Sequence, residues 1–360
     1  MPPKRVLFIS NGHGEDSIAA QIVRRLPPGF DVAAYPTLGE GRAYAGVCPI
    51  VGPRRHLPSE GHRVRGSLWR DALAGFGIGP AMGFMRREAK NYDAILVVGD
   101  LLGVVMCWLS GNRVRIYLDV YKSGFDNSYS GLERWLIART CDLVLNRDAK
   151  LAAQLPNGRF AGNVMMDTLV TGPYDAMAHR RHPRAIAILP GSRDSMRENF
   201  AVQLAALRLI PDIENVDLFV ALARPEDAAA LASATGLTLG GDLMSDGTLE
   251  FNMSSGALGA VLAASDVVLG QGGTANLQAL GLGKPVVTFL AEGTTASRAA
   301  RNAALTGDSR VVVDRDPAAM AKALQHLLAD DPDRTRRGAI GRTRMGGVGA
   351  IDAVIAELDR

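Results

Sequence analysis

Short apolar runs rich in β-branched residues alternate with amphipathic helical stretches along the whole chain. The first run, residues 6–9, predicts a buried strand, and after it Ile18, Ile22 and Leu26 form one helical stripe over residues 16–26. The spacing of Ser130 and Glu133 is that of a capping box and predicts that a helix begins there. Further strands are predicted at residues 94–99, 114–118, 142–145, 185–189, 218–222, 267–269, 286–289 and 311–313. Such alternation predicts an α/β protein with parallel sheets.

The alternation stops once, in a polar stretch near the middle of the chain, between Thr171 and Arg184, and it restarts at residue 185. We therefore expect an N-terminal domain over residues 1–168, a linker over 169–184 and a second domain over 185–345. Residues 346–360 predict a last helix, which we expect to pack back on the first domain. The predicted architecture is two Rossmann-like parallel-sheet domains that face a cleft.

Composition narrows the class of protein further. The chain has 360 residues, 47% of them hydrophobic, and a net charge of +3, which is too small to indicate a nucleic-acid partner. Its three cysteines are an odd number without a CxxC spacing, so we expect no disulfide framework and no metal site in a cytoplasmic protein. The apolar runs are too short for a signal-peptide core or a membrane span.

Three glycine-containing loops follow predicted strands, where ligands of parallel sheets bind. They are residues 10–16, 189–193 and 270–276. Glycines let the backbone approach a ligand closely, and the helix after each loop offers free N–H groups to an anion. The alternative for each loop is a turn that only connects strand and helix. The spacing matches neither a dinucleotide fingerprint nor a phosphate-binding loop with lysine.

These loops, together with Gly52-Pro53-Arg54, Asp100, residues 160–163 and residues 272–285, resemble those of a GT-B glycosyltransferase, and specifically of lipid-A-disaccharide synthase and a divergent branch related to it. The resemblance covers most of the chain. It implies a GT-B fold and an inverting transfer of a sugar from a UDP-activated N-acyl glucosamine to a lipid-linked sugar. It implies neither a metal nor another cofactor.

The resemblance also implies a donor site in the second domain. Gln278 stands where related enzymes have a glutamate that binds a ribose, so the charge there is lost. Arg193 would hold phosphates or uridine, and the loop around Thr274 would receive the diphosphate. The whole implied set is Gly191, Ser192, Arg193, Gly272, Gly273, Thr274, Asn276, Gln278 and Asn302.

In the first domain the resemblance makes Asp100 the leading general base. A strand-end carboxylate can take the proton of an acceptor hydroxyl, although aspartate also commonly caps the start of a helix. His13 is a second base candidate, because imidazole titrates near neutral pH, or else a structural residue of its turn. Gly12, Gly14 and Glu15 are expected to contact the acceptor.

Residues 42–90 combine nine Lys or Arg and three acids with apolar Leu, Trp, Phe and Met. Such a strip fits contact with an anionic membrane surface, at the inner face of the cytoplasmic membrane, or a core helix with a basic outer face.

The sequence thus predicts a UDP-sugar-dependent hexosyltransferase acting on a lipid-linked or amphipathic acceptor. Two alternatives stay open, a UDP-sugar 2-epimerase of the same fold and a non-catalytic nucleotide-sugar-binding protein.

Overall fold

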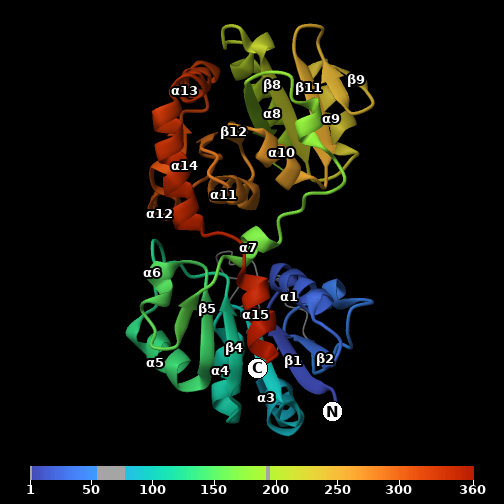
Figure 1. The fold of residues 1–360 in the computed structure, drawn as a ribbon, viewed down its shortest axis with the longest axis vertical. Helices are drawn as coiled ribbons and strands as arrows, with labels where there is room; N and C mark the ends of the chain where they lie inside the picture. The colour runs from blue at the N-terminus through green and yellow to red at the C-terminus, as the bar shows by residue number, and fades with distance from the viewer. Residues whose placement is uncertain (1, 55–77, 192–194) are drawn as a thin grey trace. The chain divides into compact units, whose positions relative to one another are not determined.

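The computed structural model describes residues 2–54, 78–191 and 195–360, and the chain forms two units (Figure 1). The first consists of Met1–Thr168 and Val348–Arg360, and the second of Leu169–Gly347. The segment 169–184, predicted as a linker, is therefore part of the second unit.

The described sheet of the first unit has six parallel strands in the order β2-β1-β3-β4-β5-β6. The predicted strands at 6–9, 94–99, 114–118 and 142–145 are confirmed, whereas β2 and β6 were not predicted. In β6 no residue is buried, so it carries no apolar pattern. The bounds are β1 Lys4–Ser10, β2 Phe30–Pro36, β3 Ala94–Gly99, β4 Val114–Asp119, β5 Cys141–Asn146 and β6 Gly158–Phe160.

Helices cover both faces of this sheet. Val6 and Phe8 of β1 pack with α1 and α15, whereas Leu7 and Ile9 pack with α3, α4 and α5. One strand serves two cores because successive side chains of a strand point to opposite faces. The bounds are α1 His13–Arg25, η1 Arg42–Tyr44, α3 Ile78–Arg87, η2 Ala89–Asn91, α4 Leu102–Ser110, α5 Gly131–Thr140, α6 Ala149–Ala152, α7 Val164–Asp167 and α15 Ala350–Leu358.

The starts of two helices test the sequence predictions. The capping box of α5 is confirmed, because the Ser130 hydroxyl accepts from Glu133 N–H and the Glu133 carboxylate accepts from Ser130 N–H. The predicted start of α1 at residue 16 is wrong. The helix begins at His13, after Gly12 with a φ of 129°. Residues 13–16 therefore form the first helical turn rather than a loop.

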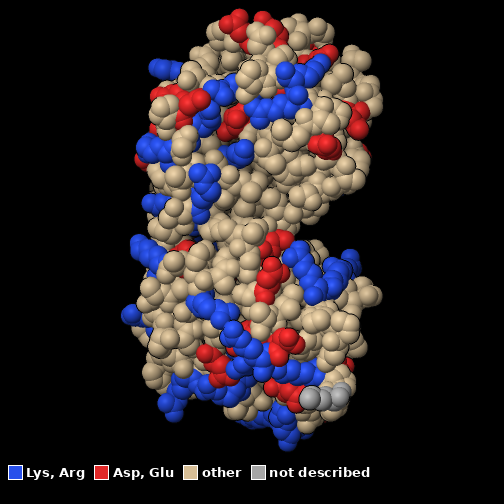
Figure 2. Space-filling model, in the orientation of Figure 1, with Lys and Arg blue, Asp and Glu red and all other residues tan. Residues whose placement is uncertain are grey.

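The C-terminal helix α15 belongs to the first unit, where Ile351 and Val354 are buried against α1 and the sheet. The carboxylate of Asp167 accepts hydrogen bonds from Gly349 N–H at 2.7 Å and Ile351 N–H at 2.9 Å. Lys4 donates to the Leu358 carbonyl at 2.7 Å, so the two termini lie together (Figure 1). Figure 2 shows Lys and Arg side chains gathered among Asp and Glu side chains at this end of the first unit.

The second unit has a described sheet of eight strands in the order β14-β13-β12-β7-β8-β11-β10-β9. The strands from β14 to β11 are parallel, and β10 and β9 add an antiparallel edge. The bounds are β7 Arg184–Leu189, β8 Val216–Leu222, β9 Thr238–Gly240, β10 Leu243–Ser245, β11 Glu250–Ser255, β12 Val267–Gly270, β13 Val286–Phe289 and β14 Arg310–Val313. The five strands predicted here are confirmed, and β9, β10 and β11 are additional.

The helices of the second unit again cover two faces. Phe200 of α8 and Leu324 of α13 share a core with Ile186 and Val220 of the sheet. Buried residues of α10 and α11, such as Val261 and Leu280, pack on the other face. The bounds are η3 Ala176–His179, α8 Met196–Leu207, η4 Ile213–Asn215, α9 Asp227–Thr235, α10 Leu258–Ala264, α11 Gly273–Gly281, α12 Ala296–Thr306, η5 Gly307–Ser309, α13 Pro317–Ala329 and α14 Asp331–Met345.

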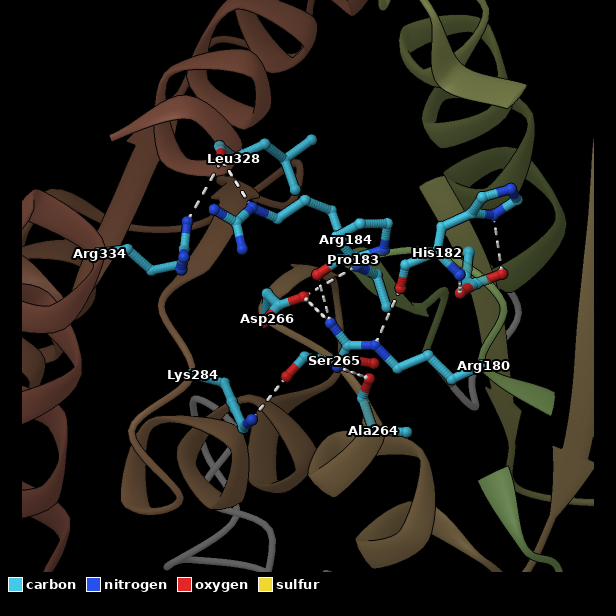
Figure 3. A network of polar contacts seen from close by, with 12 residues as sticks. Arg180, His182, Pro183, Arg184, Ala264, Ser265, Asp266, Lys284, Leu328 and Arg334 are labelled. Carbon is cyan, nitrogen blue, oxygen red and sulfur yellow. Dashed lines mark hydrogen bonds and ion pairs between the residues drawn. The ribbon is translucent and has the colours of Figure 1, made fainter. Parts of the chain in front are cut away.

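Polar contacts fasten the segment before β7 to the amino-terminal edge of the second sheet (Figure 3). The Arg180 guanidinium donates to the Asp266 carboxylate at 2.7 Å and to the Ala264 carbonyl at 2.8 Å. Asp266 also accepts from Ala185 N–H, and the buried Asp217 accepts from His182 N–H at 2.7 Å. Residues 180–184 are therefore held at the amino-terminal ends of the strands of the second unit. The predicted glycine loops follow the carboxyl ends of these strands, on the opposite side of the sheet.

Candidate functional site

In the first unit, polar side chains gather at the carboxyl ends of β1, β2 and β3. Asn11, directly after β1, donates from Nδ2 to Oδ2 of Asp100 at 2.8 Å. Its Oδ1 accepts from the Thr37 hydroxyl, directly after β2, at 3.0 Å. Three neighbouring strands thus deliver one hydrogen-bonded chain, Thr37–Asn11–Asp100, to the edge where ligands of parallel sheets bind.

Asp100 contacts both Asn11 and the start of α4. Its Oδ1 accepts from Leu102 N–H at 2.9 Å, so the carboxylate binds the first N–H of α4, whose N-cap residue is Leu101. The hydrogen bond from Asn11 uses only one acceptor position of Asp100 Oδ2, and Asp100 is half-buried rather than enclosed. The carboxylate is therefore held in place by two donors and still has capacity to accept from a substrate hydroxyl.

Glu15 lies beside Asp100 in the first turn of α1 and is only 5% exposed. A Cβ on Gly12 would lie 2.8 Å from the Glu15 carboxylate, and one on Gly99 would lie 2.8 Å from its Cγ. The φ angles of 129° and 127° at these two positions favour glycine. Burial, with repulsion from Asp100 and Asp16, raises the pKa of Glu15 to about 7. This carboxyl group therefore changes charge near neutral pH.

Asp16 is a second buried acid of this turn. Its Oδ1 accepts from the Ser10 hydroxyl at 2.6 Å, and the Ser10 oxygen lies 2.7 Å from the Tyr44 hydroxyl. Burial raises the pKa of Asp16 to about 6, against the opposing effect of the Ser10 hydrogen bond. The carboxyl groups of Glu15, Asp16 and Asp100 converge at this turn and disfavour a phosphate there when they are ionised, so the structure lends no support to the prediction that residues 10–16 bind an anion.

His13, the other base candidate, is exposed at the first position of α1. Its backbone carbonyl accepts from the Ser17 hydroxyl at 2.9 Å. Its charge lowers the pKa of Asp16, against the larger effect of burial. Gly14, also exposed, has no atom within 4 Å of a Cβ built on it, so space is open above this turn.

A second polar group, at the ends of β4 and β5, was missed by the sequence analysis. The Tyr129 hydroxyl donates to Asp119, and Asn146 Nδ2 donates to the Tyr129 oxygen at 2.9 Å. Burial raises the pKa of Asp119 to about 6, against the hydrogen bond from Tyr129. Asp119 and Asn146 are polar residues that end apolar strands, which is the same signal that identified Asp100.

In the second unit, the structure brings two of the predicted glycine loops together. Strands β7 and β12 are neighbours, and Gln271 N–H donates to the Leu189 carbonyl at 2.7 Å. A Cβ on Gly191 would lie 3.6 Å from the Gln271 carbonyl oxygen, and its φ of 97° favours glycine. Ser192 and Arg193, predicted to bind the donor, lie outside the described residues.

The third loop leads directly into α11, whose N-cap is Gly272. Gly273 and Thr274 are exposed, and nothing lies within 4 Å of a Cβ built on Gly273. The first N–H groups of α11 therefore face open space, as an anion site requires. Asn276 is buried and donates to the Gly270 carbonyl at 3.1 Å, so it shapes the loop.

Two other predicted donor residues lie on helices of the second unit. Gln278 is buried within α11, at 7% exposure. Asn302 is half-buried on α12, the helix that follows β13. A cavity of about 480 Å³ lies at the carboxyl ends of β13 and β14, lined by Leu290, Val312, Val313, Asp314, Arg315 and Ala319.

For the basic strip, residues 55–77 lie outside the described residues. In the described part, Met82 and Met85 of α3 are buried, and Arg86 and Arg87 are exposed. For α3 this supports the alternative of a core helix with a basic outer face. Among the helices of the described ranges, none is both long and apolar enough to cross a membrane. Within those ranges no three His, Cys, Asp or Glu side chains are grouped to hold a metal ion.

The chain matches no family model and no curated protein sequence. Solved structures match it over nearly its whole length. MurG of Acinetobacter baumannii is 14% identical over 99% of both chains, with a TM-score of 0.58. The spinosyn rhamnosyltransferase SpnG, complexed with thymidine diphosphate, is 15% identical over 99% of this chain and 100% of its own, with a TM-score of 0.59. A UDP-N-acetylglucosamine 2-epimerase is 16% identical over 99% and 96%, with a TM-score of 0.55.

At these identities the matches establish the fold and not the reaction. The chain has the GT-B fold, because it forms two α/β units, each with a predominantly parallel sheet, and because it resembles these solved structures. The predicted fold class is confirmed.

Proposed function

We propose that this protein is an inverting, metal-independent glycosyltransferase that moves a sugar from a UDP-sugar, UDP-N-acetylglucosamine or a close relative, to a lipid-linked or amphipathic acceptor. The reaction is similar to that of lipid-A-disaccharide synthase, which the sequence resembles. In this proposal the second unit binds the donor and the first unit binds and deprotonates the acceptor. The observation that supports this proposal most directly is that Asp100 lies beside Glu15, a carboxyl group whose pKa is about 7.

Two features of the second unit support donor binding. The loops at Gly191 and Gly272 lie side by side, and the exposed start of α11 offers backbone N–H groups to a diphosphate. A helix N-terminus alone stabilises an anion by only about 0.3–1 kcal/mol at an exposed site. We therefore assign to Arg193, which follows Gly191 by two residues, most of the phosphate affinity.

The first unit supports the acid–base step. The acceptor hydroxyl attacks the anomeric carbon of the donor, its proton passes to the Asp100 carboxylate, and the bond to the UDP oxygen breaks so that UDP leaves with the electron pair. Glu15, beside this carboxylate, becomes negatively charged as the pH rises through about 7, and a second negative charge favours transfer of the acceptor proton to this site. The rate should therefore rise with pH through about 7, and Glu15→Gln should remove that rise.

The lipid-linked acceptor rests on the resemblance to lipid-A-disaccharide synthase. The open space above Gly14, next to the carboxyl groups, supports a sugar hydroxyl bound at the first unit. His13, exposed on the same turn, is proposed to contact the acceptor rather than to act as the base.

A UDP-sugar 2-epimerase is the second candidate, because solved structures of UDP-N-acetylglucosamine 2-epimerases match 99% of the chain. The same carboxyl groups could remove and return a proton on the donor sugar. The product decides between the two: an epimerase converts a UDP-sugar without any acceptor, whereas a transferase releases UDP only when the acceptor is present.

The deciding experiment measures UDP release from UDP-N-acetylglucosamine, with and without a lipid-linked N-acyl glucosamine, alongside calorimetric binding of UDP. We expect Asp100→Asn to lower kcat by about 10²–10⁴-fold and leave UDP affinity unchanged. Arg193→Ala should weaken UDP binding at least about tenfold. The exposed Asp352→Asn in α15 is the matched control and should behave as wild type.

Unchanged turnover in both Asp100→Asn and Arg193→Ala would refute the proposed mechanism. UDP binding without turnover of any sugar donor would instead support the non-catalytic nucleotide-sugar-binding alternative.

A further inference from the structure

Two side-chain amides of α8 contact the strand ends that lead into the glycine loops of the second unit. Asn199 and Gln203 are four residues apart, so they lie on the same face of the helix. Gln203 Nε2 donates to the Leu269 carbonyl at 3.1 Å and to the Leu189 carbonyl at 3.5 Å. These carbonyls belong to the last residues of β12 and β7. One side chain thus bridges the two neighbouring strands where both turn into their loops.

Asn199 fixes the peptide group between Pro190 and Gly191. Its Nδ2 donates to the Pro190 carbonyl at 3.1 Å, and a Cβ built on Gly191 would lie 3.9 Å from the same nitrogen. The C=O and N–H of a trans peptide group point in opposite directions. A Pro190 carbonyl held toward α8 therefore directs the Gly191 N–H away from this helix. The amide decides that the loop presents a hydrogen-bond donor there rather than an acceptor.

The same arrangement is found at both strand ends. In the third loop, Asn276 Nδ2 donates to the Gly270 carbonyl at 3.1 Å. Side-chain NH2 groups therefore engage two successive carbonyls at the end of each strand, Leu189 and Pro190 for β7 and Leu269 and Gly270 for β12. The repetition on neighbouring strands shows that the direction of these carbonyls is controlled at both loops.

Gln203 lowers the stability of the core in which it lies. It is fully buried, and its Oε1 has no hydrogen-bond partner among the described residues. An unsatisfied buried acceptor destabilises the folded state, and the Leu189 carbonyl already accepts from Gln271 N–H at 2.7 Å. Phe200 and Leu204, beside Gln203 in α8, are apolar core residues. An apolar side chain of the same size would therefore suit the fold better, and residues that violate the rules of packing in this way are typical of functional sites.

We propose that Asn199 and Gln203 are positioning residues of the donor site, which prepare the two glycine loops to bind the diphosphate of a nucleotide. Carbonyl oxygens repel an anion, whereas backbone N–H groups bind it. Amides that hold the strand-end carbonyls toward α8 keep these oxygens away from the diphosphate and set the spacing of the two loops. Both residues act through the backbone and need no contact with the ligand. The inference rests on the proposed binding of the donor by the second unit.

Calorimetric binding of UDP and of UMP to the full chain tests the inference. The ratio of the UMP to the UDP dissociation constant measures what the second phosphate adds. Asn199→Leu and Gln203→Met keep the shape of each side chain and remove its donor. We expect each to weaken UDP binding about tenfold, about the effect of one hydrogen bond to a charged group, and UMP binding less than about threefold. The ratio should therefore fall by about threefold or more.

Thermal unfolding without ligand separates a positioning role from a purely structural one. Because Gln203 is buried with an unsatisfied oxygen, Gln203→Met should unfold at the same temperature as wild type or at a higher one. A residue that serves only the fold would lower this temperature when replaced, and UDP and UMP binding would weaken by equal factors. Asn199 is half-buried, so Asn199→Leu tests the inference independently of any change in the core.

Gln325→Met of α13 is the matched control. The Gln325 amide also donates to a carbonyl of the second unit, that of Leu209 at 3.4 Å, but beyond the far end of α8. This variant should bind both nucleotides as wild type does. An unchanged ratio in Asn199→Leu and Gln203→Met, in a protein that binds UDP, would overturn this inference and leave the proposed function intact. A wild-type protein that binds no UDP would refute the donor site itself, and this inference with it.

Discussion

Replacing Glu15 with glutamine should change how the stability of the first unit depends on pH. Folding raises the pKa of Glu15 from 4.5 to about 7, so the folded state binds this proton more tightly than the unfolded state. The stability that the protonated carboxyl group provides is complete below about pH 4.5 and is lost as the pH rises through about 7. The full difference between the two pKa values corresponds to about 3 kcal/mol of folding free energy. We expect about 2 kcal/mol, because Glu15 remains 5% exposed and water screens part of its charge.

Glutamine has the same shape and does not titrate. At pH 5 we therefore expect Glu15→Gln and wild type to unfold with similar free energies. At pH 8 the variant should be more stable by about 2 kcal/mol, provided the amide fits between Gly12 and Gly99.

Tryptophan fluorescence during urea unfolding is the suitable assay, because all three tryptophans of the chain belong to the first unit. The exposed Glu88→Gln serves as the control and should follow wild type at every pH. If the difference between Glu15→Gln and wild type stayed constant from pH 5 to pH 8, the buried acid would not titrate as described. The link drawn between Glu15 and the pH dependence of catalysis would then also fail.

Two further predictions concern stability. Tyr129→Phe removes the hydroxyl that donates to Asp119, so the pKa of this carboxyl group, already about 6, should rise further. The variant should lose about 1–3 kcal/mol in the same fluorescence assay, more at pH 8 than at pH 5, and an equal loss at both would contradict this account. Gly341→Ala in α14 would place a Cβ 2.4 Å from the Leu280 carbonyl oxygen and should cost about 1–3 kcal/mol by calorimetry. Gly347→Ala, which meets nothing within 4 Å, is its control, and equal effects of the two would show that the α11–α14 contact is looser than described.

Apolar periodicity predicted most of the buried strands, because a central parallel strand needs apolar side chains on both faces. Val6 to Ile9 are all fully buried, and the pattern there is unmistakable. Edge elements escaped the same reasoning, since β6 and β9 bury no side chain and so leave no periodic trace. The early start of α1 was missed for a local reason, because two glycines at its beginning resemble a loop.

The sequence alone determined the fold class, the strand-end position of Asp100 and the glycine loops around Gly191 and Gly272. It could do so because these features depend on residue order along single strands. Only the tertiary structure decided that Glu15 is buried against Gly12 and Gly99, and that Asp100 is held by Asn11 from another strand. A pKa depends on which groups surround a carboxyl group in space, and burial and neighbouring charge arise only when distant strands pack together.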